Sequence, residues 1–202
     1  MTIRILIAED QGMMRSALAT LLDLEDDLTV VATVARGDEV VARVVESAPD
    51  VVLLDIELPG RSGLDLVPSV IAARPGCHVL MVTTFARPGY LRRALESGAR
   101  AFLVKDDPVE DLAAAIRRVL AGEIVVNPAL AAQALTAAPN PLTEREREVL
   151  AASAGGVTIA DIAARLHLST STVRNYLSTT IGKTGARNRG EALTRARERG
   201  WL

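Results

Sequence analysis

Five polar residues each follow or end a short apolar run, and their types suit one kind of chemistry. Glu9 and Asp10 follow IRILIA, Asp55 ends VVLLD, Thr83 ends HVLMVT, and Lys105 follows AFLV. Three carboxylates placed together raise one another's pKa values unless a cation joins them, and hard oxygen ligands suit Mg²⁺. A lysine can neutralise a phosphoryl oxygen, and a threonine hydroxyl can donate to another. Because carboxylates accept phosphoryl groups covalently, the set predicts an aspartyl-phosphate site.

These residues meet only if the apolar runs are strands of one parallel sheet. The five runs alternate with segments of 3.6-residue periodicity, which predicts five strands and five helices. The expected strands are 3–8, 28–34, 51–55, 78–83 and 101–104, and the expected helices are 13–24, 40–47, 64–73, 90–96 and 109–120. This order predicts an α/β fold with a doubly wound, five-stranded parallel sheet, whose functional crevice lies beyond the carboxyl ends of the strands.

The rest of the chain has a different character. Residues 122–141 are rich in Ala and Pro and almost uncharged, which predicts a linker with about one helical turn. The linker would join a domain at 1–121 to an all-α domain at 142–202. Net charge supports two modules with different partners, because the total of −2 divides into −5 before residue 122 and +3 after it.

Within the basic part, the helices expected at 159–166 and 170–183 follow one another closely and predict a helix-turn-helix. Arg174, Asn175 and Ser178 should lie on the outward face of the second helix. Arginine suits guanine and asparagine suits adenine in the major groove of DNA. The candidate contacts to DNA phosphates are Lys183, Arg187 and Arg189. A solvated helix face without DNA is the simpler alternative.

Composition excludes several other classes of protein. The only cysteine is Cys77, so no disulfide forms within the chain, which favours a reducing cytoplasm. The first apolar run is too short for a signal peptide or a membrane span. Aromatic residues make up only 2% of the chain, so aromatic platforms for single-stranded nucleic acid are not expected.

The first 120 residues resemble the receiver domain of bacterial two-component response regulators. The motifs that match are Glu9-Asp10, Asp55 followed by Pro59-Gly60, Thr83, and Lys105 before Asp106-Asp107-Pro108. The resemblance implies that Asp55 is the phosphoacceptor. It also implies that Mg²⁺ is bound by Asp10 and Asp55, by Glu9 through water, and by Glu57 through its backbone carbonyl. Thr83 and Phe102 match the family's switch pair, but Phe102 lacks the hydroxyl of the tyrosine often found there.

Residues 142–202 resemble the helix-turn-helix domain of NarL/FixJ regulators, also called LuxR-type. The matching stretches are LTEREREVL, IADIAARLHLSTSTVRNYLS and Gly185-x-Arg187-x-Arg189. Gly182 and Thr184 stand where longer residues are usual, which predicts a loose end to the recognition helix. Within this family the chain is most similar to the DesR subgroup, regulators of membrane-lipid desaturase genes, through stretches such as TTFARPGY and RERGWL.

The resemblance implies a cytoplasmic, non-enzymatic transcription factor. A sensor histidine kinase would phosphorylate Asp55, receivers would then pair through their first and fifth helices, and the homodimer would bind double-stranded promoter DNA. Two alternatives remain open at this point. One is a Mg²⁺-dependent phosphotransfer enzyme with the helical domain as a lid. The other is a phosphorylation-gated regulator whose helical domain docks onto a protein instead of DNA.

Overall fold

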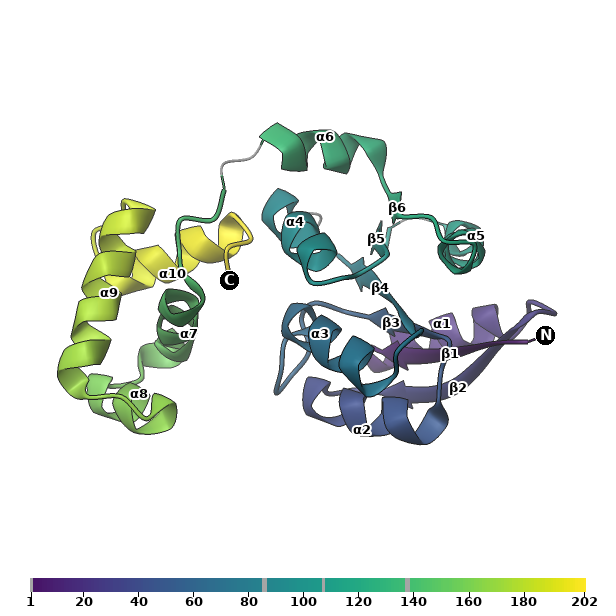
Figure 1. Ribbon diagram of the computed structural model, residues 1–202, viewed down its shortest axis with the longest axis horizontal. Coiled ribbons are helices and arrows are strands. Elements are labelled where there is room, and N and C mark those ends of the chain that lie inside the picture. The colour runs from purple at the N-terminus through teal and green to yellow at the C-terminus, as the bar shows by residue number, and fades with distance from the viewer. Residues whose placement is uncertain (1, 85–86, 107, 137–138) are drawn as a thin grey trace. The chain divides into compact units, whose positions relative to one another are not determined.

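The computed structural model describes residues 2–84, 87–106, 108–136 and 139–202, which form two compact units (Figure 1). The first consists chiefly of residues up to Ala134, and the second chiefly of residues from Leu135 onward. Asp107 of the motif after Lys105, and Phe85 and Ala86 of TTFARPGY, lie outside the described residues. In the part of the chain that is described, no helix is both long and apolar enough to span a membrane.

A parallel sheet forms the centre of the first unit, as the alternation of runs predicts. Its order is β2-β1-β3-β4-β5-β6, and every neighbouring pair is parallel. The strands are β1 (Ile3–Ala8), β2 (Leu28–Val34), β3 (Val51–Leu54), β4 (His78–Thr83), β5 (Ala101–Val104) and β6 (Val125–Val126). All four residues of β3 are buried, which explains its unbroken apolar run. The expected number of five strands is wrong, because β6 adds a sixth.

In the described residues, a helix connects each strand of the sheet to the next one along the chain, from β1 to β6. The side chains of each strand alternate between the two faces of the sheet. The helices are α1 (Gly12–Leu22), α2 (Gly37–Ser47), α3 (Gly63–Ala73), α4 (Pro88–Glu96) and α5 (Val109–Leu120). On one face, Ile5 and Ile7 of β1 join a core with Leu22 of α1 and Ile116 of α5. Because strand side chains alternate, buried Leu6 points to the opposite face.

The segment expected to be a linker contains regular structure. Val125 of β6 belongs to the core of the first unit, and β6 pairs with Ala101 and Phe102 of β5. A nine-residue helix, α6 (Pro128–Thr136), follows directly, where about one turn was expected. The Asn127 side chain accepts hydrogen bonds from backbone N–H groups at its start, and Pro128 occupies its first position. An Arg92 Nη2 group donates to the Ala134 carbonyl at 2.6 Å.

In its described residues the second unit contains helices and no strand, as predicted. Its helices are α7 (Glu144–Ala152), α8 (Ile159–Leu166), α9 (Thr170–Thr184) and α10 (Arg189–Glu198), with a 3₁₀ turn at Ala154–Gly156. The capping box of Thr143 and Glu146 is present, and Ser169 caps α9. Val173, Leu177 and Thr180 of α9 face the interior, and Tyr176 is half-buried. The hydrophobic core joins all four helices around residues such as Val149, Ile162, Val173, Ala192 and Trp201.

One glycine is fixed by the close approach of two backbone segments. A Cβ atom on Gly63, the first residue of α3, would lie 1.9 Å from the carbonyl oxygen of Asp55. The Gly63 N–H donates to the Ile56 carbonyl, and the Ser62 hydroxyl donates to the same oxygen. The absence of a side chain at residue 63 therefore lets the loop after β3 fold tightly behind Asp55.

Gly63→Ala should lower the free energy of unfolding by about 2 to 3 kcal/mol, because the backbone of the loop must move to admit the methyl group. Urea denaturation of the full chain, followed by circular dichroism, measures this. Gly182→Ala is the control for an alanine that the structure can accept, since a Cβ atom at Gly182 meets nothing within 4 Å. It should stabilise α9 by up to about 1 kcal/mol through helix propensity. Equal stability of Gly63→Ala and wild type would contradict the close approach.

Candidate functional site

Backbone pairing places the predicted site residues side by side at one edge of the sheet. Ala8 of β1 pairs with Leu54 of β3, so the residues that follow them, Glu9 and Asp55, are neighbours. The Asp55 N–H donates to the Ala8 carbonyl at 3.0 Å. On the other side, the Lys105 N–H donates to the Thr83 carbonyl at 2.9 Å. The carboxyl ends of β1, β3, β4 and β5 therefore converge, as the predicted fold requires.

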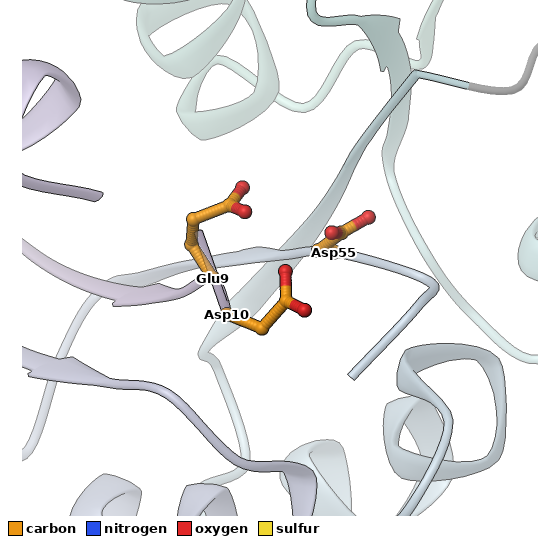
Figure 2. A group of neighbouring side chains, drawn as sticks. All are labelled: Glu9, Asp10 and Asp55. Atoms are coloured by element: carbon orange, nitrogen blue, oxygen red, sulfur yellow. The ribbon is translucent and has the colours of Figure 1, made fainter. Parts of the chain in front are cut away.

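Three carboxylates gather around one space at this edge (Figure 2). Glu9 and Asp10 come from the end of β1 and Asp55 from the end of β3, with one oxygen of each within 4.8 Å of the others. Glu9 and Asp55 are buried, at 2% and 4% exposure, whereas Asp10 is exposed. Hard carboxylate oxygens with one solvent-facing member form a donor set that suits Mg²⁺, which retains several waters in proteins.

A buried lysine links two of these carboxylates. The Lys105 Nζ atom lies 2.5 Å from Glu9 Oε2 and 2.8 Å from Asp55 Oδ2, and its side chain is 2% exposed. Burial alone would lower the pKa of Lys105, but its bonds to Asp55 and Glu9 outweigh this and raise the pKa. For Glu9, burial dominates and raises the pKa, although the bond from Lys105 opposes it. The ammonium therefore stays charged and neutralises part of the acidic cluster.

Backbone contacts fix the loops that carry the carboxylates. Arg15 Nη1, from the first turn of α1, donates to the Glu9 carbonyl at 2.6 Å and to the Asp10 carbonyl at 3.3 Å. The Gln11 N–H donates to Glu9 Oε1, and the Glu57 N–H approaches Asp55 Oδ1 at 3.4 Å. Arg15 could not be predicted as part of this site, because a side chain that binds main-chain carbonyls leaves no recognisable spacing in the sequence.

The remaining predicted residues of this site lie near it. Thr83 ends β4 and is fully buried, and Glu57 is exposed two residues after Asp55. Phe102 is fully buried in β5, where its register partners are Met81 and Val126. The sheet therefore connects the residue predicted as the switch aromatic directly to β6.

An apolar pocket of about 110 Å³ opens beside the acidic cluster. It lies between α1 and α5, with Met14, Leu18 and Leu21 on one side and Leu112 on the other, and Lys105 contributes to its wall. Met13, which precedes the pocket residue Met14 in the sequence, is 88% exposed. The pocket wall is mostly apolar and includes Leu21, which is 40% exposed, so the pocket is a candidate interaction surface.

The helix-turn-helix predicted in the second unit is present. His167 ends α8 in a left-handed conformation, which turns the chain into α9. The predicted base-reading residues Arg174, Asn175 and Ser178 are all exposed on α9. They form a surface that could enter a DNA groove without rearrangement of the core.

The three predicted phosphate contacts differ from one another. Arg187 has an 89% exposed side chain that pairs with Glu191. Arg189 Nη1 donates to the Val157 carbonyl at 2.9 Å, which ties α10 to the segment before α8. The Lys183 Nζ atom lies 2.8 Å from Oε2 of buried Glu146. Arg187 is therefore the most accessible of the three cations.

Comparison with known proteins assigns both units. Residues 5–117 match the response regulator receiver domain, and residues 140–196 match the bacterial regulatory proteins of the luxR family. The chain is 46% identical to the uncharacterized transcriptional regulatory protein YvfU and 45% identical to the transcriptional regulatory protein DesR, both of Bacillus subtilis (strain 168). Each comparison covers at least 99% of both proteins. The crystal structure of the response regulator ChrA, from a heme-sensing two-component system, is 31% identical, with a TM-score of 0.56 over 100% of this chain and 99% of that one.

Lys105→Met should lower the free energy of unfolding by about 3 kcal/mol near neutral pH, because it leaves two buried carboxylates without their cation. The deficit should shrink at about pH 5. The pKa of folded Glu9 is already raised by burial, and loss of the bond from Lys105 raises it further. A carboxyl group with a raised pKa in the folded state loses stability as pH rises through that pKa. The variant's loss of free energy of unfolding is therefore larger at neutral than at acidic pH.

Urea denaturation in a chelator-containing buffer at the two pH values measures this deficit. Arg43→Met is the matched control, because it removes an exposed ion pair with Glu46 and should cost less than about 1 kcal/mol. A deficit for Lys105→Met that is equal at both pH values would contradict the role assigned to Glu9.

Proposed function

The chain belongs to the LuxR-type response regulators, which are transcription factors of two-component systems and not enzymes, and we propose that phosphorylation of Asp55 controls its binding to promoter DNA. The observation that supports this most directly is the buried bond between Asp55 and Lys105 inside the acidic cluster. We further propose that residues 1–121 act as the receiver, 122–141 as the connection, and 142–202 as the DNA-binding domain.

Magnesium is the proposed cofactor. Asp10 and Asp55 would bind it through their carboxylates, Glu9 through a water molecule, and Glu57 through its backbone carbonyl. The support is the donor set itself, since three carboxylates come within 4.8 Å of one another. When bound, the ion would neutralise negative charge that the incoming phosphoryl group brings to the site.

In the proposed reaction, an Asp55 carboxylate oxygen attacks the phosphorus atom of a phosphohistidine on a sensor kinase. A new O–P bond forms, the N–P bond breaks, and its electron pair returns to the histidine. The Lys105 ammonium already lies 2.8 Å from Asp55 Oδ2, so it can pass to a phosphoryl oxygen with a small movement. Thr83, at the end of β4, would donate its hydroxyl to another oxygen, and Phe102 would adjust its packing in response.

Phosphorylation would then promote pairing of two chains. We propose α1 and α5 as the pairing surface, supported by the apolar pocket between them, whose wall includes Leu21 at 40% exposure. Pairing would bring two recognition helices to half-sites one turn of DNA apart, so that two weak contacts act together. Arg174, Asn175 and Ser178 would read bases, and Arg187 would contact phosphate.

The cellular setting follows from these partners. A sensor kinase domain and promoter DNA meet in the cytoplasm, which we propose as the location, without insertion into a membrane. Promoters of membrane-lipid desaturase genes are the first targets to test, because the chain resembles the DesR subgroup and is 45% identical to DesR. The similar identity to YvfU, whose function is uncharacterized, means that targets must be found by experiment.

Asp55→Asn should abolish both phosphorylation and the dimerisation that depends on it. Wild-type protein with acetyl phosphate and Mg²⁺ should gain the mass of one phosphoryl group and shift from monomer to dimer in light scattering. The variant should do neither, because an amide cannot form the acyl phosphate. Glu39→Gln, which changes an exposed carboxylate in the first turn of α2 and lies outside the proposed pairing surface, is the control and should behave as wild type. Dimerisation of Asp55→Asn with the donor would contradict phosphorylation-controlled pairing.

Capture of genomic DNA fragments tests whether phosphorylation of Asp55 also controls DNA binding. Wild-type protein should enrich a few palindrome-bearing promoters with acetyl phosphate and Mg²⁺, and far fewer without them. Asp55→Asn should retain only the weak enrichment in both conditions. Equal enrichment by wild type with and without the donor would show DNA binding that phosphorylation does not control. No enrichment in either condition would favour a protein-interaction output.

A further inference from the structure

The C-terminal end of the recognition helix is held by groups from two other helices. Lys183 lies in the last turn of α9, and its Nζ atom bonds Glu146 Oε2 of α7 at 2.8 Å. From α10, Arg195 Nη1 donates to the last carbonyls of α9, at 3.2 Å to Thr184 and 2.6 Å to Gly185. Carbonyls at a helix end lack partners within the helix, so a cation there both satisfies and stabilises them.

The partner of Lys183 is the buried carboxylate of Glu146, whose charge would be unpaired without a cation. Glu146 is 5% exposed, and the oxygen that accepts from Lys183 also accepts from the Thr143 N–H at 2.7 Å. Burial tends to raise the pKa of Glu146, but the bonds from Lys183 and Thr143 outweigh it and hold the pKa below its ordinary value. The carboxylate is therefore ionised at neutral pH, and removal of the lysine would leave a buried charge unpaired.

This end of α9 needs external support because of its sequence. Gly182 lies inside the helix, where glycine is about 1 kcal/mol less favourable than alanine, and Thr184 is also a weak helix former. The base-reading residues Arg174, Asn175 and Ser178 lie on the same helix, at most three turns before Lys183. A change in the direction of α9 at its C-terminal end would therefore move these side chains relative to a DNA groove.

We propose that Lys183 is a positioning residue for DNA recognition, whose ammonium fixes the recognition helix to the capping box of α7 and does not bind a DNA phosphate. The proposal rests on DNA binding by the second unit. It changes the role first expected for Lys183, and it adds Glu146 as the second member of a pair. Arg187, with its 89% exposed side chain, is the matched residue that should behave as a phosphate contact.

The salt dependence of DNA affinity separates these two roles. Each phosphate contact contributes about 0.9 to the slope of log affinity against log salt concentration. The probe is a duplex carrying a palindrome recovered by genomic capture with wild-type protein, and affinity is measured by fluorescence anisotropy with the full chain. The variants are Lys183→Met, Lys183→Arg, Glu146→Gln, the double variant Lys183→Met with Glu146→Gln, and Arg187→Met.

Lys183→Met should weaken binding roughly tenfold at every salt concentration, with an unchanged slope, because a misplaced helix loses base contacts without losing a phosphate contact. Glu146→Gln should do the same, and the double variant should be no weaker than either single one, since both remove one interaction. Lys183→Arg should retain affinity. Arg187→Met should instead reduce the slope by about 1.

A reduced slope for Lys183→Met together with unchanged binding by Glu146→Gln would overturn the proposal in favour of a phosphate contact. Trp201, the only tryptophan in the chain, lies buried in the core of the second unit, so its fluorescence reports whether each variant is folded. If Lys183→Met is unfolded, Glu146→Gln and Lys183→Arg decide between the two roles. Weak binding by Glu146→Gln with the wild-type slope, together with retained binding by Lys183→Arg, supports positioning. Wild-type affinity of Glu146→Gln overturns it. Absence of binding by wild type would instead contradict the DNA-binding function itself.

Discussion

The bond from Lys105 to Glu9 and Asp55 is the interaction on which the receiver's site depends. Two carboxylates that are 2% and 4% exposed would repel each other in a medium of low polarity. The parallel sheet causes this repulsion, because it brings Glu9 and Asp55 at the ends of β1 and β3 to one edge. It also reduces the repulsion, because the end of β5 places Lys105 between them. The tight loop at Gly63 and the Arg15 bonds to backbone carbonyls then keep the three groups within reach.

Much of the fold could be predicted from sequence because most elements carry a clear period. The first five strands and helix α5 begin and end within about one residue of their expected positions, since buried strands and amphipathic helices differ plainly in pattern. Strand β6 could not be predicted, because two residues define no period and its existence depends on the open edge of β5. Helix α6 did leave a signal, an N-cap asparagine followed by proline at Asn127-Pro128, which the Ala-rich composition obscured.

The candidate sites divide in the same way. The positions of side chains placed by strand ends or by one face of a helix could be predicted, as Asp55, Lys105 and Arg174 illustrate. The roles expected of Glu57 and Phe102 came from the family resemblance alone. Contacts between distant segments could not be predicted. The pair of Glu146 and Lys183 joins two helices across 37 positions of sequence. Sequence alone gives Lys183 as one more cation at the end of the recognition helix, and the proposal that it positions this helix depends on its partner Glu146.

The two lysines show how one kind of bond can serve different purposes. Lys105 is shared between carboxylates from two separate loops, so under the proposed phosphorylation a new anion on Asp55 would compete with Glu9 for it. Lys183 bonds a carboxylate that the N-terminus of α7 also holds through Thr143, so its partner is fixed by the helix itself. A cation with exchangeable partners suits a group that must respond to chemistry. A cation with a fixed partner suits a helix whose direction must stay constant while its exposed face meets DNA.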